Sequence, residues 1–107
     1  MQQEFLCDIA EVSVPASLGV EHKQEHFIVV VDHGGVFVYK NSCPHLGIQL
    51  DVREDEFLDM GGEFIVCANH GALFEIDSGL CIAGPCKGDR LVAVQSMCKD
   101  SQVFLLA

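Results

Sequence analysis

Short runs of β-branched and aromatic residues dominate the hydrophobic pattern of the chain. Residues 26–31 (HFIVVV) and 36–40 (VFVYK) flank a glycine-containing turn at 32–35, which predicts a β-hairpin. Residues 63–67 (EFIVC) and 72–77 (ALFEID) predict a second pair of strands. A turn is expected at 78–79 and an irregular segment at 80–88, and further strands are expected at 4–12, 91–97 and 102–107.

Short strands at this spacing predict an all-β fold, a small antiparallel barrel or sandwich. Only residues 15–23 and 46–59 could hold a turn of helix. The 107 residues contain no linker and no internal repeat, so we expect one domain over residues 1–107.

The candidate chemistry lies in two short stretches that combine cysteine, histidine and glycine. The first stretch is CPHLG (43–47) and the second is CANHG (67–71), so that 21 residues separate His45 from Cys67. Both stretches fall where a predicted strand meets a loop. Loops held by a rigid sheet are a usual place for binding residues.

Three interpretations of these stretches are open. The four residues could be unrelated, with buried cysteines and hydrogen-bonded histidines. They could hold a structural zinc ion, although zinc fingers usually keep cysteine pairs and histidine pairs on separate arms. They could also hold a [2Fe–2S] cluster in which two histidines replace two cysteines on one iron. In this third case each loop gives its cysteine to one iron and its histidine to the other, which accounts for the mixed arms.

The two stretches and their flanks resemble the cluster boxes of Rieske proteins. The first box is CPHLGIQLD (43–51) and the second is CANHGALFEIDSGLCIAGPCKG (67–88), and the likeness extends over nearly the whole chain. The resemblance implies a Rieske fold with one [2Fe–2S] cluster, in which a cluster-binding portion of about residues 42–88 is inserted in a β base. It implies that Cys43 and Cys67 hold the buried iron, and that His45 and His70 hold the outer iron, which takes the electron.

Departures from the high-potential Rieske proteins of cytochrome bc complexes indicate a low potential. Those proteins carry an additional disulfide between the boxes, whereas this chain has Ile48, Ala68 and Asn69 there. They also carry a serine that donates to a sulfide, and its position is taken here by Ala72. Fewer hydrogen bonds to sulfur stabilise the added electron less.

The resemblance is therefore to soluble ferredoxins that supply oxygenases. It implies a one-electron carrier that is not itself an enzyme, with a flavin-containing reductase and a terminal oxygenase as partners. The alternative is a small Rieske-like subunit of a larger reductase, such as nitrite reductase.

Charge and cysteine usage refine this picture. Sixteen acidic and six basic residues give a net charge of −10, so we expect no nucleic-acid partner. No signal peptide or membrane span is visible, so a cytoplasmic protein is expected, with metal-bound or free cysteines rather than three disulfides. Cys81 and Cys86 flank Pro85 in the loop that the resemblance places over the cluster, and they are either inert thiols or redox-active. Cys7 and Cys98 are expected to be core or structural residues.

Residues 51–63 hold six acidic residues and one arginine, a net charge of −5. Because this segment connects the boxes, we expect it to lie near the cluster. It is either a solvated loop or a docking surface for a basic partner.

Overall fold

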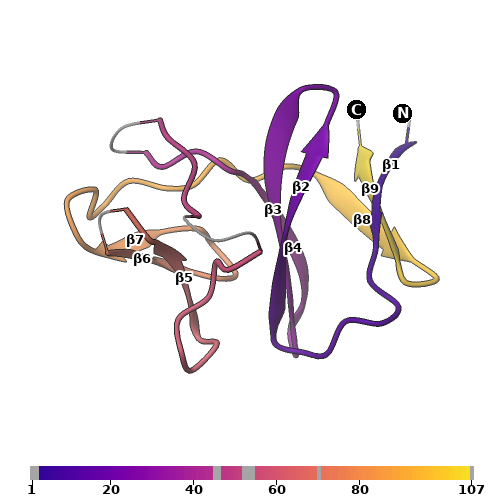
Figure 1. The fold of residues 1–107 in the computed structure, drawn as a ribbon, viewed down its shortest axis with the longest axis horizontal. Coiled ribbons are helices and arrows are strands. Elements are labelled where there is room, and N and C mark those ends of the chain that lie inside the picture. Colours follow the sequence, from indigo (N-terminus) through magenta and orange to yellow (C-terminus); the bar gives the residue numbers. More distant parts are fainter. Residues whose placement is uncertain (1–2, 45–46, 52–54, 70, 107) are drawn as a thin grey trace.

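The computed structural model describes residues 3–44, 47–51, 55–69 and 71–106. Within these ranges the chain forms nine strands and no helix, arranged as three antiparallel sheets of three strands each (Figure 1). The all-β prediction is therefore confirmed. The strands are β1 (Gln3–Asp8), β2 (Ala16–His22), β3 (Glu25–Asp32), β4 (Gly35–Lys40), β5 (Phe64–Cys67), β6 (Ala72–Glu75), β7 (Cys81–Ala83), β8 (Ser96–Lys99) and β9 (Gln102–Leu106).

The central sheet, β2-β3-β4, is covered on both faces. Successive side chains of a strand point to opposite faces. Ile28 and Val30 of β3 accordingly enter the core that this sheet shares with β5-β6-β7. Val29 and Val31 enter a second core, shared with the sheet of order β1-β9-β8. Burial on both faces explains why the sequence of β3 is continuously apolar instead of alternating.

The third sheet, β5-β6-β7, consists wholly of residues that lie between β4 and β8 in the sequence. It stands to one side of the central sheet, opposite the side occupied by β8 and β9 (Figure 1). In its register Cys67 faces Ala72 at one end, and Phe64 faces Glu75 at the other. The Cys67–Ala72 end carries the second Cys/His stretch across the tip of the β5–β6 pair, as the sequence predicts.

The segment 15–23 does not form a turn of helix, as expected from sequence, but strand β2. Its residues pair with β3 along their whole length, from Ala16 opposite Val31 to His22 opposite Glu25. Lys23 and Gln24 make the connecting turn with φ of 51° and 69°. This left-handed turn contains no glycine, so its sequence gives no hairpin signal. The described parts of residues 46–59 also contain no helix.

The C-terminal third differs from the prediction in two places. Residues 81–83, expected to be irregular, form β7 on the edge of the third sheet. The strand expected at 91–97 begins later, at Ser96, and continues through Lys99. Asp100 and Ser101, with φ of 53° and 62°, turn the chain into β9. Over the described residues, no helix is long and apolar enough to cross a membrane.

Candidate metal centre

The two Cys/His stretches fold into loops that are closed in the same way. The amide of Gly47 donates to the carbonyl oxygen of Cys43 over 2.7 Å, and the amide of Gly71 donates to the carbonyl oxygen of Cys67 over 2.7 Å. The two glycines have φ of 71° and 70°, in the left-handed region that favours glycine. Each Cys/His stretch, 43–47 and 67–71, is thus closed by a hydrogen bond from its final glycine to its first cysteine.

Hydrogen bonds hold the two loops side by side. The amide of Ala68, in the second loop, donates to the carbonyl oxygen of Leu50 over 2.9 Å. The side-chain nitrogen of Asn69 donates to the carbonyl oxygen of Gln49 over 3.0 Å. The two boxes therefore form one structural unit, although 21 residues separate their Cys/His motifs.

Both cysteines of this unit are buried in the same apolar core. Cys43 and Cys67 each have a relative exposure of 0%, and both pack in the core that contains Leu50 and Ile65. Two sulfur atoms on adjoining loops suit a soft metal or an iron–sulfur cluster, because thiolates are the preferred ligands of both.

The two candidate histidine ligands, His45 and His70, lie outside the described residues. Among the residues that the structure describes, no three metal-binding side chains gather at one point. The chemistry of the two buried sulfurs fits the predicted cofactor, while the complete ligand set remains a prediction.

Asn41 supports the first box and was not identified from the sequence. It is buried at 8% exposure directly after β4. Its side-chain oxygen accepts the amide of Leu50 over 2.8 Å, and its side-chain nitrogen donates to the Asp51 carboxylate over 3.0 Å. Asn41, two residues before the first box, is thereby bonded to the end of that box. The only signal in the sequence is a polar residue between a buried strand and a cysteine.

The loop after β7 packs against the base of the second box. Gly84, with φ of 104°, lies so close to Ala72 that a Cβ atom on it would come within 2.8 Å of the Ala72 Cα. This places Ala72 under the Gly84–Pro85 loop, which agrees with the covering role that the resemblance implies.

Cys81 and Cys86, at the two ends of this loop, are buried thiols with exposures of 1% and 2%. Their sulfur atoms are 3.1 Å apart, and the Cys81 thiol donates to the carbonyl oxygen of Ala83 over 3.2 Å. Burial, together with the hydrogen bond to Cys81, raises the pKa of the Cys86 thiol to about 12.

The other two cysteines lie at the opposite side of the fold, in β1 and β8. Cys7 is half-buried, and burial raises the pKa of its thiol to about 11. Cys98 is exposed, so its expected place in the core is wrong. It lies in β8, the edge strand of the sheet β1-β9-β8, so strand pairing covers it on one side only.

The acidic segment 51–63 starts at the boxes but ends away from them. It runs beside β5, with the Val66 amide bonded to the Phe57 carbonyl oxygen and the Asp59 amide bonded to the Phe64 carbonyl oxygen. Asp59 therefore lies beyond the end of β5 that is distant from Cys67, about 10 Å along the strand. The expected position near the cluster is wrong for this part, and residues 52–54 lie outside the described residues.

Several acidic side chains of this segment hold the structure together. The Asp55 carboxylate accepts the amide of Gly19 over 2.7 Å, and the Asp55 carbonyl oxygen accepts the hydroxyl of Ser17 over 2.8 Å. Asp59 accepts the amides of Glu63 and Phe64 over 2.8 and 3.1 Å. Asp55 and Asp59 therefore have structural roles, and the interpretation of the segment as a docking surface stays a prediction.

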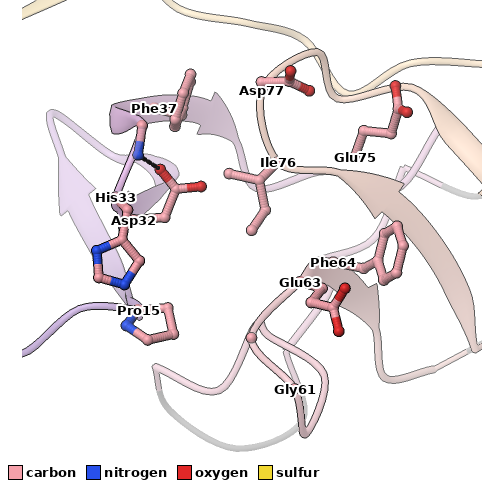
Figure 2. Close-up of a pocket in the computed structure, with 12 residues that line it drawn as sticks. Pro15, Asp32, His33, Phe37, Gly61, Glu63, Phe64, Glu75, Ile76 and Asp77 are labelled. Carbon is pink, nitrogen blue, oxygen red and sulfur yellow. Dashed lines mark hydrogen bonds between the residues drawn. The ribbon is translucent and has the colours of Figure 1, made fainter.

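A groove of about 610 Å³ lies at the same distant end (Figure 2). Figure 2 shows Asp32, at the end of β3, and His33 on one side of this groove, with Glu63, just before β5, and Glu75 of β6 on the other. Phe64 and Glu75, at the end of the β5–β6 pair opposite Cys67 and Ala72, both line this groove, so it is separate from the two Cys/His stretches, 43–47 and 67–71.

The Rieske [2Fe-2S] domain model matches residues 2–97 of the chain. A ferredoxin from Sphingomonas yanoikuyae B1 is similar in structure, with a TM-score of 0.77, 25% identity and 99% of each chain covered. The ferredoxin of carbazole 1,9a-dioxygenase from Nocardioides aromaticivorans IC177 has a TM-score of 0.77 at 17% identity, covering 98% of this chain and 97% of its own. A putative nitrite reductase (NADPH) small subunit has a TM-score of 0.73 at 19% identity over 100% of both chains.

No curated protein sequence matches the chain. The match of the domain model spans both Cys/His loops and seven of the nine strands completely, since it ends within β8. The chain therefore belongs to the Rieske family, whose domains bind a [2Fe–2S] cluster.

Proposed function

We propose that the chain is a one-electron carrier whose [2Fe–2S] cluster is held by Cys43, His45, Cys67 and His70 within residues 42–88. The observation that carries this proposal is the pair of loops with the same closing hydrogen bond, each starting with a buried cysteine. When bound, the cluster accepts one electron and gives it up again.

The protein's part in this chemistry is to fix the ligands and to keep water from one side of the site. The glycine turns and the bonds between Asn69 and Gln49 and between Ala68 and Leu50 fix the loops relative to one another. The apolar core covers the sulfur side. Fixed ligands reduce the structural change that accompanies each electron transfer.

The surface around the boxes suits transient docking. The exposed described residues of the two Cys/His loops and of the Gly84–Pro85 tip carry no charge: Gly47, Ile48, Gln49, Ala68, Asn69, Gly71, Gly84 and Pro85. Lys87, farther along the covering loop, is exposed and basic. Ile48 is 40% exposed, which is high for a large apolar residue. A surface with few charges and one large apolar side chain can release its partner quickly, as a carrier must.

In this proposal a flavin-containing reductase supplies the electron and a terminal oxygenase receives it in the cytoplasm. The similarity to the ferredoxin of carbazole 1,9a-dioxygenase supports an oxygenase as the acceptor. The five thiols at Cys7, Cys43, Cys81, Cys86 and Cys98 are free in the structure, which suits a reducing compartment. In this proposal the chain carries electrons and does not itself catalyse a reaction.

A second candidate is a small subunit bound permanently to a larger reductase, supported by the similarity to a putative nitrite reductase small subunit. The two functions differ in the size of the native species. Size-exclusion chromatography of the protein from its source cells should give a small free protein for a carrier. Co-elution with a large flavoprotein would favour the subunit.

The direct test of the carrier is electron transfer through it. The purified protein should be reduced by NADH and a flavin-containing ferredoxin reductase, seen as bleaching of the cluster absorbance. It should then be reoxidised by an oxidised Rieske oxygenase faster than by oxygen alone. A protein that is reduced but passes no electron to any oxygenase would contradict the oxygenase part of the proposal.

A further inference from the structure

One peptide group of the first box, between Gln49 and Leu50, is held from two sides by asparagine side chains. Its carbonyl oxygen accepts a hydrogen bond from the side-chain nitrogen of Asn69 over 3.0 Å. Its N–H group, which is the Leu50 amide, donates to the side-chain oxygen of Asn41 over 2.8 Å. Asn69 belongs to the second loop, and Asn41 precedes the first box. A single peptide group therefore joins two side chains that are distant in the sequence.

This series of hydrogen bonds ends on a carboxylate. The side-chain nitrogen of Asn41 donates to the Asp51 carboxylate over 3.0 Å. The orientation of the Asn41 amide is thereby fixed, because a flipped amide would set its nitrogen against the Leu50 N–H group and its oxygen against the carboxylate. Asn69 is oriented in the same way, since only its nitrogen can donate to a carbonyl oxygen. Every donor in the series therefore points toward Asp51.

A negative charge at the accepting end strengthens the whole series. Hydrogen bonds to an ionised acceptor are the stronger ones, and consecutive hydrogen bonds polarise one another. Asn41 and the Leu50 amide are buried, so water does not compete at the centre of the series. Asn69 is exposed, so its bond is the one most open to water. Polarisation of the peptide group from the Asp51 side makes its oxygen a better acceptor for Asn69.

We propose that Asn41 and Asn69 are positioning residues for the cluster, which together with Asp51 hold the second loop in a fixed relation to the first box. This inference rests on the proposed function, in which His70 is a cluster ligand. Asn69 directly precedes His70 in the sequence, so a bond that fixes Asn69 constrains the start of the backbone that carries this ligand. Partners of this kind orient metal ligands and strengthen metal binding.

A double-mutant cycle tests whether the two asparagines act together. Asn41→Ala in the cluster-loaded protein should lose iron to a chelator about 10-fold faster than wild type, and Asn69→Ala should lose it faster by a smaller factor. Because both side chains act on one peptide group, the double variant should lose iron little faster than Asn41→Ala. A double variant whose acceleration equals the product of the two single ones would show independent action and overturn the proposal.

Gln49→Ala is the matched control for this cycle. It removes an exposed polar side chain of the same loop but keeps the backbone carbonyl oxygen that accepts from Asn69. Its rate of iron loss should equal that of wild type. A rate as fast as that of Asn69→Ala would mean that any change in this loop loosens the cluster, and would overturn the proposal.

Exchanging the side chains at positions 41 and 51 tests the series without leaving the Leu50 amide unpaired. Asn41→Asp alone removes the donor to Asp51 and sets two carboxylates against each other, so iron loss should be faster. The double variant Asn41→Asp/Asp51→Asn keeps an acceptor for the Leu50 amide, restores a donor and acceptor pair and has the net charge of wild type. It should retain iron as wild type does. A double variant no better than Asn41→Asp would overturn the proposal.

Pulsed EPR of the reduced protein distinguishes positioning of a ligand from general loop stability. Asn69→Ala should shift or broaden the coupling to one histidine nitrogen and leave the other unchanged, because Asn69 adjoins only His70. Faster iron loss with both couplings unchanged would mean that loop stability alone is affected, and would overturn the positioning role.

The outcomes separate this inference from the proposed function. A wild-type protein without a reducible cluster would refute the proposed function itself. A reducible cluster whose iron loss and histidine couplings are the same in wild type, Asn41→Ala and Asn69→Ala would refute only the role of the two asparagines.

Discussion

Gly84, in the covering loop, lies so close to Ala72 that a side chain at position 84 would not fit between them. Gly84→Ala should therefore destabilise the protein and loosen the cluster. Its Cβ atom would come within 2.8 Å of the Ala72 Cα, and its φ of 104° is unfavourable for alanine. We expect the clash to cost about 1–3 kcal/mol beyond the backbone strain.

Gly88→Ala is the matched control for this prediction. Gly88 has a similar φ of 95°, but no atom lies within 4 Å of the position of its Cβ. Thermal unfolding and cluster loss on heating should therefore change much more for Gly84→Ala than for Gly88→Ala. Equal effects of the two substitutions would show that backbone strain, and not contact with Ala72, causes the loss of stability.

Tyr39 connects the central sheet to the third sheet through a single hydrogen bond. Its hydroxyl donates to the carbonyl oxygen of Ile76 over 2.5 Å, and the side chain is 2% exposed. Tyr39→Phe should lower the free energy of unfolding at neutral pH by about 1 kcal/mol. Denaturant unfolding of the two proteins measures the difference.

The effect of Tyr39→Phe should depend on pH in the alkaline range. Burial raises the pKa of Tyr39 to about 12, from an ordinary value of 10.0. Above pH 10 the unfolded chain loses this proton while the folded protein keeps it, so wild-type stability falls as pH rises from about 10 to about 12. Tyr39→Phe has no phenol to deprotonate, so its stability does not fall in this way. The difference in the free energy of unfolding between wild type and Tyr39→Phe should therefore shrink over that pH range. Tyr39 is the sole tyrosine, and tyrosinate absorbance near pH 10 in the folded protein would contradict this account.

Asp55 should matter for stability, whereas its neighbour Glu56 should not. Asp55→Ala removes the acceptor of the Gly19 amide and places alanine at a φ of 64°, which should cost about 1–2 kcal/mol. Asp55→Asn keeps an acceptor oxygen and tolerates this φ, so it should cost less. Glu56→Ala removes the same charge from an exposed side chain and should stay within about 0.5 kcal/mol of wild type. Similar melting temperatures for Asp55→Ala and Glu56→Ala would refute the structural role.

Ile48 should contribute to partner docking without affecting the potential. Ile48→Ser should lower the second-order rate of reduction by the reductase, because it removes the exposed apolar side chain beside the first box. Met60→Ser is the control, since Met60 is fully exposed in the turn before β5, away from the boxes. Stopped-flow reduction of both variants tests this. Equal slowing by the two substitutions would contradict docking through the boxes.

Much of the fold follows from local sequence signals. The hairpin of β3 and β4 was predictable because its turn contains glycines and its strands are apolar runs. Strand β2 was not, because Gly19 and the polar residues around it gain their strand conformation from pairing with β3. The start of β8 was misplaced because Leu91 is buried and Val94 is partly buried, although neither belongs to a strand of the structure.

The candidate site was predictable only where short-range motifs define it. The cysteines and glycines of the boxes could be identified because each loop is five residues long. The supporting residue Asn41 could not, because its role depends on contacts made in the folded chain, with Leu50 and Asp51. Likewise, the path of the acidic segment depends on its pairing with β5.

The central claim is that one cluster is held by two cysteines and two histidines, and pulsed EPR of the reduced protein with 15N-labelled histidine tests it most directly. The account predicts coupling of the unpaired electron to two histidine nitrogens. Both couplings should persist when His22, His26 and His33 are all replaced by glutamine, which leaves only His45 and His70. Stoichiometric zinc without a paramagnetic signal, or a reduced cluster without two histidine couplings, would contradict it.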